Sequence, residues 1–229
     1  QTCALPIYPG ALDLIKTRKI GVQDEGSQLV AFVFAAASAG ENWLDMCAGP
    51  GGKAALLSNI ARQRRITFTA NEVSEVRADL VRQVVNGDRV LVGDGREIGD
   101  QSEKFDAILI DAPCTGLGAL RRRPEVRWRR NLQDLRELTQ LQRELIDSGI
   151  KALNVGGVLG YATCSPHLAE TTIQVSDLMR KHANMEQIDV APYLPINLVD
   201  SERDHAMALW THRTGTDAMF LALFKKVSE

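Results

Sequence analysis

The sequence predicts an α/β fold, a mostly parallel sheet with helices on both faces. Strand-like and helix-like segments alternate along most of the 229 residues, which is typical of parallel sheets. The run FDAILI at residues 105–110 is almost continuously apolar, as expected of a central strand that is buried on both faces. A glycine-rich turn, GPGG at residues 49–52, joins the first expected strand to a helix.

Each expected element follows from a local pattern. Residues 22–39 indicate a turn and an apolar helix, which Asp24 or Ser27 begins and Gly40 ends. Short apolar or β-rich runs predict strands at residues 42–48, 66–70, 89–93, 105–110, 157–162, 185–190 and 218–224. Helical patterns cover residues 52–63, 74–85, 131–153 and 168–182. No helix separates the last two of these seven strands, so we expect the final strand to be antiparallel, and residues 191–217 to be loop.

The composition narrows the class of protein. Hydrophobic residues make up 45% of the chain and charged residues 24%, which fits a globular domain and not a disordered one. No apolar run has the length of a membrane span and no stretch resembles a signal peptide, so we expect a cytoplasmic monomer without membrane association. Four separated cysteines, without a CxxC pair or a nearby histidine, favour free thiols over a metal site.

The beginning of the chain carries little fold signal. The first seven residues, QTCALPI, match the translation of a common sequencing adapter. We therefore expect residues 1–21 to be a non-native scar and linker, and residues 22–229 to form one functional domain. On this interpretation the natural protein begins further upstream.

Polar and reactive residues follow the carboxyl ends of five expected strands. They are Gly49–Lys53, Glu72, Asp94, Asp111 with Cys114, and Cys164. Ligands of an open parallel sheet bind beyond these strand ends, so we expect these residues to share one site. The turn at residues 49–52 has neither the dinucleotide nor the P-loop spacing, and an ordinary strand-to-helix turn is an alternative interpretation.

Individual residues in this group also have alternative interpretations. Glu72 lies 21 positions after Gly51, an offset suited to a ribose contact, but it could instead cap the next helix. Asp94 could meet an adenine amino group or form a turn. Free cysteines are usually buried hydrophobes, yet Cys114 and Cys164 lie just past strand ends, where a thiolate can act as a nucleophile.

A basic segment, RRRPEVRWRR at residues 121–130, contrasts with the net charge of −2 for the whole chain. Such a run can be no more than a solvated surface. Pro124 and Trp128 interrupt it, however, and arginines interleaved with an aromatic ring suit RNA phosphates and stacked bases. The expected RNA-binding residues are Arg121, Arg122, Arg123, Arg127, Trp128, Arg129 and Arg130.

Five motifs together resemble the RNA cytosine-C5 methyltransferases of the Sun/Fmu (NOL1/NOP2/sun) family, over about residues 22–225. They are VQDEGSQLVA, DMCAGPGGK, DAPCTGLGALRRRPEVRW, YATCSPHLAE and HRTGTDAMF. The bacterial branch that acts on 16S ribosomal RNA is the most similar. The resemblance implies a Rossmann-like class I methyltransferase domain at residues 22–229, S-adenosylmethionine as cofactor and ribosomal RNA as partner. That branch usually carries an N-terminal domain related to the NusB antiterminator, which we expect to be missing here.

The resemblance also implies roles for single residues. Cys164 would be the nucleophile that adds to C6 of cytosine, Cys114 would assist release of the methylated RNA, and Asp111 would lie between cofactor and base. The residues implied to bind S-adenosylmethionine are Cys47, Ala48, Gly49, Pro50, Gly51, Gly52, Lys53, Glu72, Arg77, Asp94 and Asp111. The departures are small: Gly49 replaces a common alanine, Glu72 a frequent aspartate and Thr171 a common asparagine.

Other functions are less consistent with these motifs. A DNA cytosine-C5 methyltransferase would use the cysteine of Pro113-Cys114, whereas Thr163-Cys164-Ser165 argues for the later cysteine. An amino-group methyltransferase would show Asn-Pro-Pro-Tyr after the fourth strand, and a nicotinamide dehydrogenase another glycine spacing. Methylation of tRNA or another RNA stays open as an alternative. A non-catalytic RNA-binding scaffold also stays open, and formation of a covalent RNA adduct would exclude it.

Overall fold

The computed structural model describes residues 12–17, 20–85, 87–196, 198 and 202–229. The expected adapter scar at residues 1–7 lies outside these ranges, while a short helix, α1 (Asp13–Lys16), lies within them. No helix in the described ranges is both long enough and apolar enough to cross a membrane.

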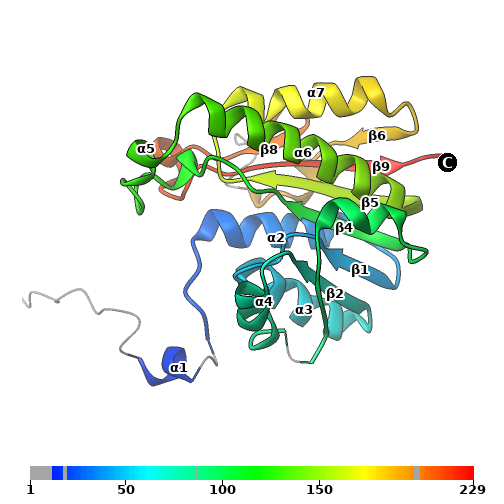
Figure 1. Cartoon of the computed structure of the whole chain (residues 1–229), viewed down its shortest axis with the longest axis horizontal. Coiled ribbons are helices and arrows are strands. Elements are labelled where there is room, and N and C mark those ends of the chain that lie inside the picture. Colours follow the sequence, from blue (N-terminus) through cyan, green and yellow to red (C-terminus); the bar gives the residue numbers. More distant parts are fainter. Residues whose placement is uncertain (1–11, 18–19, 86, 197, 199–201) are drawn as a thin grey trace, which may run out of the picture.

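Nine strands of the described residues form one sheet, in the order β3-β2-β1-β4-β5-β9-β8-β7, with β6 also paired to β9 (Figure 1). The strands are β1 Asn42–Asp45, β2 Thr67–Glu72, β3 Arg89–Val92, β4 Phe105–Asp111, β5 Leu153–Thr163, β6 Met185–Ile188, β7 Glu202–Arg203, β8 Ala206–Ala208 and β9 Phe220–Lys226. Strands β1 to β5 are parallel, and β9 is antiparallel to β5, β6 and β8. The predicted mostly parallel sheet with an antiparallel last strand is confirmed.

The expectation of loop at residues 191–217 was wrong. This region contains the 3-10 helix η5 (Ala191–Tyr193), strands β7 and β8, and helix α8 (Thr211–Thr214). Strands of two and three residues are too short to show an alternating pattern, and β8 is held by its pairing with β9. Strand β5 also begins earlier than expected, because Leu153 pairs with Phe105 where the sequence predicts the end of a helix.

Five further helices agree with the sequence pattern. They are α2 Glu25–Ala37, α3 Gly52–Arg64, α4 Glu75–Arg82, α6 Leu132–Ala152 and α7 Thr172–Lys181. The short helix α5 (Val126–Arg129), in the basic segment at residues 121–130, was not predicted. Asp24 begins α2 by accepting a hydrogen bond from the Gly26 N–H (3.0 Å). Asn131 and Asp134 form a capping box that begins α6, the longest of these helices.

Side chains at alternating strand positions build two cores, one on each face of the sheet. Trp43 and Leu109 pack with α2 and α3 on one face. Leu44 and Ile110, their neighbours along the strands, pack with α6 and α7 on the other. Helices α6 and α7 lie side by side along the sheet (Figure 1). This three-layer packing buries the apolar side chains that stabilise the fold and leaves the strand ends free to build a site.

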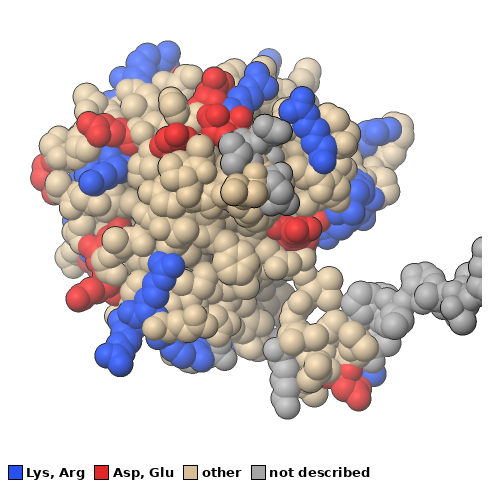
Figure 2. All heavy atoms as spheres, turned by 180° about the vertical axis from the view of Figure 1, so that it is seen from behind, with Lys and Arg blue, Asp and Glu red and all other residues tan. Residues whose placement is uncertain are grey.

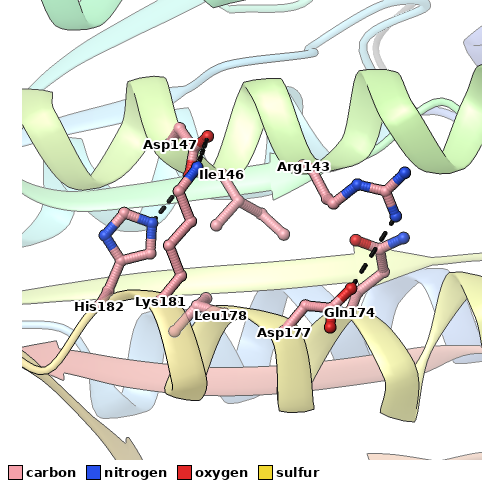
Figure 3. Close-up of a pocket in the computed structure, with 8 residues that line it drawn as sticks. All are labelled: Arg143, Ile146, Asp147, Gln174, Asp177, Leu178, Lys181 and His182. Atoms are coloured by element: carbon pink, nitrogen blue, oxygen red, sulfur yellow. Dashed lines mark hydrogen bonds and ion pairs between the residues drawn. The ribbon is translucent and has the colours of Figure 1, made fainter.

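Helix α7 is tied to α6 by charged side chains (Figure 3). Asp147 lies 2.5 Å from Lys181 Nζ and 2.7 Å from His182 Nε2. The cavity beside this cluster measures only about 30 Å³, which holds a water or two and not a cofactor. We therefore interpret the cluster as a structural contact that holds the carboxyl end of α7 against α6.

Candidate active site

The glycine turn after β1 is shaped by two positions that require glycine. Gly51, which precedes α3, has φ of +114°, a conformation that strains residues with a side chain. A Cβ at Gly49 would collide with the carboxylate of Glu72. The hydrogen bond from the Gly51 N–H to the Ala48 carbonyl (2.8 Å) closes the turn. Glycine thus lets the chain reverse while an acidic side chain approaches its backbone.

Glu72, at the end of β2, is buried and joins the glycine turn to α4. Its Oε2 accepts a hydrogen bond from the Gly49 N–H and its Oε1 one from the Ser74 N–H, both at 3.0 Å. Arg77 lies 3.6 Å from Oε1 and also donates to the Gly49 carbonyl. The bond to Ser74, which precedes α4, agrees with the capping interpretation, whereas the contact with the glycine turn was not predicted. Glu72 also lines the cavity described below, where the expected ribose contact stays a prediction.

Two acidic side chains lie near Lys53, on α3. Asp111, at the end of β4, forms a 2.7 Å ion pair with Lys53. Burial alone would lower the pKa of Lys53, but the interaction with Asp111 outweighs this effect and raises the pKa. Asp45, at the end of β1, is fully buried, and among the described residues neither carboxylate oxygen has a partner at good hydrogen-bond geometry, although the Cys47 backbone interacts with it. Burial, together with the charge of Asp111, raises the pKa of Asp45 to about 7. The sequence analysis missed Asp45, although an acid within the apolar run WLDM was a signal.

Asp94, beyond β3, forms the turn that was its alternative interpretation. It accepts a hydrogen bond from the Arg96 N–H (2.9 Å) and begins the 3-10 helix η2 (Gly95–Asp100). The Arg96 guanidinium also bonds to both of its oxygens, which lowers the pKa of Asp94. Asp94 nevertheless lines the same cavity as Glu72.

The two expected active-site cysteines are in contact. The Sγ atoms of Cys114, in the loop after β4, and Cys164, at the end of β5, lie 3.3 Å apart. This contact lowers the pKa of Cys164 against the effect of burial, and the charge of Lys53 lowers it further. The same contact, together with burial, raises the pKa of Cys114. Cys164 is therefore the thiol of the pair that loses its proton more readily.

Gly118 holds the backbone around Cys164. Its N–H donates to the Cys164 carbonyl (2.9 Å), and its carbonyl accepts from the Ala218 N–H (3.0 Å). A Cβ at this position would collide with the Ala218 carbonyl and lie 2.8 Å from the Cys164 oxygen. The close approach of three chain segments therefore requires glycine at this point.

A cavity of about 410 Å³ lies beyond the strand ends and gathers half of the expected site residues. Those that line it are Cys47, Gly49, Glu72, Arg77, Asp94, Asp111, Cys114, Arg123, Arg130 and Cys164. The expected residues that do not line it are Ala48, Pro50, Gly51, Gly52, Lys53, Arg121, Arg122, Arg127, Trp128 and Arg129. Further lining residues that the sequence analysis did not single out include Asn71, Arg96, Thr115, Leu141 and Leu145. The volume is within the range of small-molecule sites. Acidic, basic and thiol groups thus share one cavity with the glycine turn.

The basic segment at residues 121–130 divides into two parts. Arg121 donates to Asp24 (2.7 Å), and Arg122 bonds to both carboxylate oxygens of Asp217. Both acids are buried, so these two arginines tie the segment to the beginnings of α2 and β9. Their charge is therefore largely matched within the protein.

The rest of the segment faces outward. Arg123 and Arg130 border the cavity, and Trp128, on α5, is 82% exposed. Arg127 and Arg129 are also exposed. Figure 2 shows basic side chains at several edges of the molecule, and the edge that carries α5 in Figure 1 is one of them. Two arginines of the segment thus border the cavity, and an exposed aromatic ring lies on the neighbouring helix α5.

Solved structures share this architecture and define the class of fold. A structure of NSun6 from Pyrococcus horikoshii with SFG aligns with a TM-score of 0.81 at 27% identity, over 96% of this chain and 56% of that chain. A second, PH0851, aligns with a TM-score of 0.83 at 29% identity, over 94% and 49%. The fold is that of a class I methyltransferase.

The sequence comparison defines the family. The model of the family 16S rRNA methyltransferase RsmB/F matches residues 33–225, and the chain belongs to this family. It is 48% identical over 226 residues to a Mycobacterium tuberculosis protein named "Putative methyltransferase MT1451", covering 96% of this chain and 49% of that protein. It is 36% identical over 181 residues to ribosomal RNA small subunit methyltransferase B of Vibrio cholerae, covering 77% and 41%. The chain thus spans about half the length of these relatives.

Proposed function

We propose that the chain transfers a methyl group from S-adenosylmethionine to C5 of a cytosine in RNA, through a covalent bond between Cys164 Sγ and C6 of the base. The observation that carries the proposal is the contact of two cysteines from neighbouring strand ends at the wall of a cavity lined by the glycine turn. Small-subunit ribosomal RNA is the proposed substrate, because the family and its relatives are named for it.

The residues around the cavity fit S-adenosylmethionine. The cavity is lined by the carboxylates of Glu72, Asp94 and Asp111. They suit a ligand with ribose hydroxyls, an adenine amino group and positive charge. The bound cofactor would supply an electrophilic methyl group, and the turn at residues 47–53 would surround its methionine part.

In the proposed reaction the two cysteines have different roles. C5 of cytosine is a poor nucleophile, and addition of the Cys164 thiolate to C6 makes C5 electron-rich enough to attack a methyl group. After C5 has accepted the methyl group, its proton leaves, the C5–C6 double bond reforms and the Cys164 thiolate departs. We assign assistance in this elimination to Cys114, and stabilisation of the developing charge on the base to Asp111. The base must be unpaired or flipped to reach the site.

Transfer of a labelled methyl group tests the proposed function. The protein is incubated with S-adenosylmethionine that carries an isotopic methyl label and an RNA derived from 16S ribosomal RNA, and the product nucleosides are analysed. We expect labelled 5-methylcytidine from the wild-type protein and none from Cys164→Ala. Label in another nucleoside, or undiminished 5-methylcytidine with Cys164→Ala, would contradict the proposal.

A further inference from the structure

A buried carboxylate joins the segments that carry the two cysteines. Glu170 ends the 3-10 helix η4 (Leu168–Glu170), six residues after Cys164, and its side chain is fully buried. A buried carboxylate is costly unless hydrogen bonds satisfy it. The donors that surround Glu170 come from the Cys114 loop and from α6.

These hydrogen bonds hold the backbone on both sides of Cys114. Glu170 Oε1 accepts from the Thr115 N–H (2.8 Å), and Oε2 accepts from the Thr115 hydroxyl (2.5 Å). The Gln142 amide donates both to Glu170 (3.2 Å) and to the Pro113 carbonyl (2.9 Å). The residue before Cys114 and the residue after it are therefore linked to one carboxylate, directly or through Gln142.

The same network is anchored to the strand that leads to Cys164. The Tyr161 hydroxyl, on β5, lies 2.8 Å from the Glu170 carbonyl and 3.1 Å from Gln142 Oε1. The Ser165 hydroxyl, next to Cys164, lies 3.3 Å from the Thr115 hydroxyl. Tyr161 and Ser165 lie on either side of Cys164 in sequence. The network therefore fixes the positions of the Cys114 and Cys164 segments relative to each other.

We propose that Glu170 is a positioning residue that holds the Cys114 thiol against the Cys164 thiol. The role in catalysis rests on the proposed function, in which Cys114 assists release of the methylated RNA. The thiol contact itself is measurable without RNA or cofactor. Since this contact is the main cause of the lowered pKa of Cys164, loosening the Cys114 loop will raise that pKa.

The first test measures the pH dependence of Cys164 alkylation by iodoacetamide, resolved by peptide mass spectrometry. Glu170→Gln keeps the shape of the side chain but replaces one acceptor oxygen by a donor that faces the Thr115 hydroxyl. We expect the alkylation midpoint to rise by about half a pH unit or more in Glu170→Gln and in Cys114→Ala. In the double variant we expect no shift beyond that of Cys114→Ala, because Glu170 acts through Cys114.

Ser58→Ala is the matched control. Ser58 is buried on α3 and donates to the Val85 carbonyl and the Asp88 carboxylate, neither of which belongs to the Cys114 loop or to η4. We expect this variant to lose stability and keep the wild-type midpoint. If Glu170→Gln does not fold, Glu170→Asp, which keeps the charge and shortens the reach, replaces it with the same expected shift. An unchanged midpoint in the folded variant, or a further shift in the double variant, would overturn the proposal.

The second test measures release of the RNA. With an RNA that contains ordinary cytosine, we expect both Glu170→Gln and Cys114→Ala to accumulate a denaturant-stable protein–RNA complex, with release about tenfold slower than in the wild type. Release at the wild-type rate would contradict the positioning role. Absence of any adduct with the wild-type protein, even on 5-fluorocytosine RNA, would instead reject the proposed function and leave the alkylation result as an independent test of the thiol contact.

Discussion

At the scale of single residues, the site is organised by carboxylates with different surroundings. Glu72 and Glu170 are buried and receive several hydrogen bonds, whereas the oxygens of Asp45 receive none of good geometry from the described residues. Asp111 is partly exposed and paired with Lys53. Since burial disfavours an unpaired charge, Asp45 is the carboxyl whose protonation couples most strongly to the stability of the fold.

Asp45 therefore makes stability depend on pH. Its pKa is raised from the ordinary value of 3.8 to about 7, so the folded protein binds a proton that the unfolded chain releases between these values. The free energy of unfolding must fall as the pH rises through this window. We expect Asp45→Asn to remove this fall and to be more stable than the wild type at pH 8, by a few kcal/mol, since one pKa unit corresponds to about 1.4 kcal/mol.

Urea unfolding of the cofactor-free protein between pH 4 and 8 measures this effect. The two proteins should be similar in stability near pH 4 and should diverge as the pH rises. Parallel curves across the whole range would show that Asp45 is ionised in the folded protein, contrary to the structure.

At the scale of elements, the basic segment at residues 121–130 has two functions. Arg122 neutralises the buried Asp217 at the start of β9, whereas Arg129 is exposed on α5. The first contact contributes to folding, and the second side chain is available to RNA phosphates. The two arginines should therefore respond differently to substitution.

Replacement by alanine separates these functions. We expect Arg122→Ala to lower the free energy of unfolding by about 1–2 kcal/mol, less than for a fully buried pair because Arg122 is half exposed. We expect Arg129→Ala to leave stability unchanged and to weaken RNA binding. The slope of the logarithm of the RNA-binding constant against the logarithm of salt concentration should decrease in magnitude by about one. Chemical unfolding and RNA binding at several salt concentrations provide the measurements, and the opposite assignment of effects would contradict this division.

The sequence predicts the regular elements well because their patterns are local. The apolar run of β4 and the capped start of α6 are visible within a few neighbouring residues. The partners of Arg121 and Arg122 are not, because Asp24 and Asp217 lie more than ninety positions away. The short strand β8 likewise depends on its pairing with β9 and not on its own residues.

At the scale of the whole molecule, the order of the strands explains why the site forms where it does. Strands β1, β2, β4 and β5 are parallel neighbours, so their carboxyl ends bring the glycine turn, Glu72, Asp111 and Cys164 to one edge. The sequence analysis predicted this gathering from the order of strands and motifs. It did not identify Asp45 or Glu170, since the burial of a single acid depends on how the helices cover the sheet.

A trapping gel tests the central claim, covalent catalysis by Cys164, most directly. The protein is incubated with S-adenosylmethionine and a 16S-derived RNA containing 5-fluorocytosine, whose fluorine at C5 blocks the final elimination, beside Cys164→Ala and Cys114→Ala. We expect a denaturant-stable protein–RNA adduct with the wild type and with Cys114→Ala, and none with Cys164→Ala. An adduct that persists without Cys164 and disappears without Cys114 would contradict the assignment and make Cys114 the nucleophile.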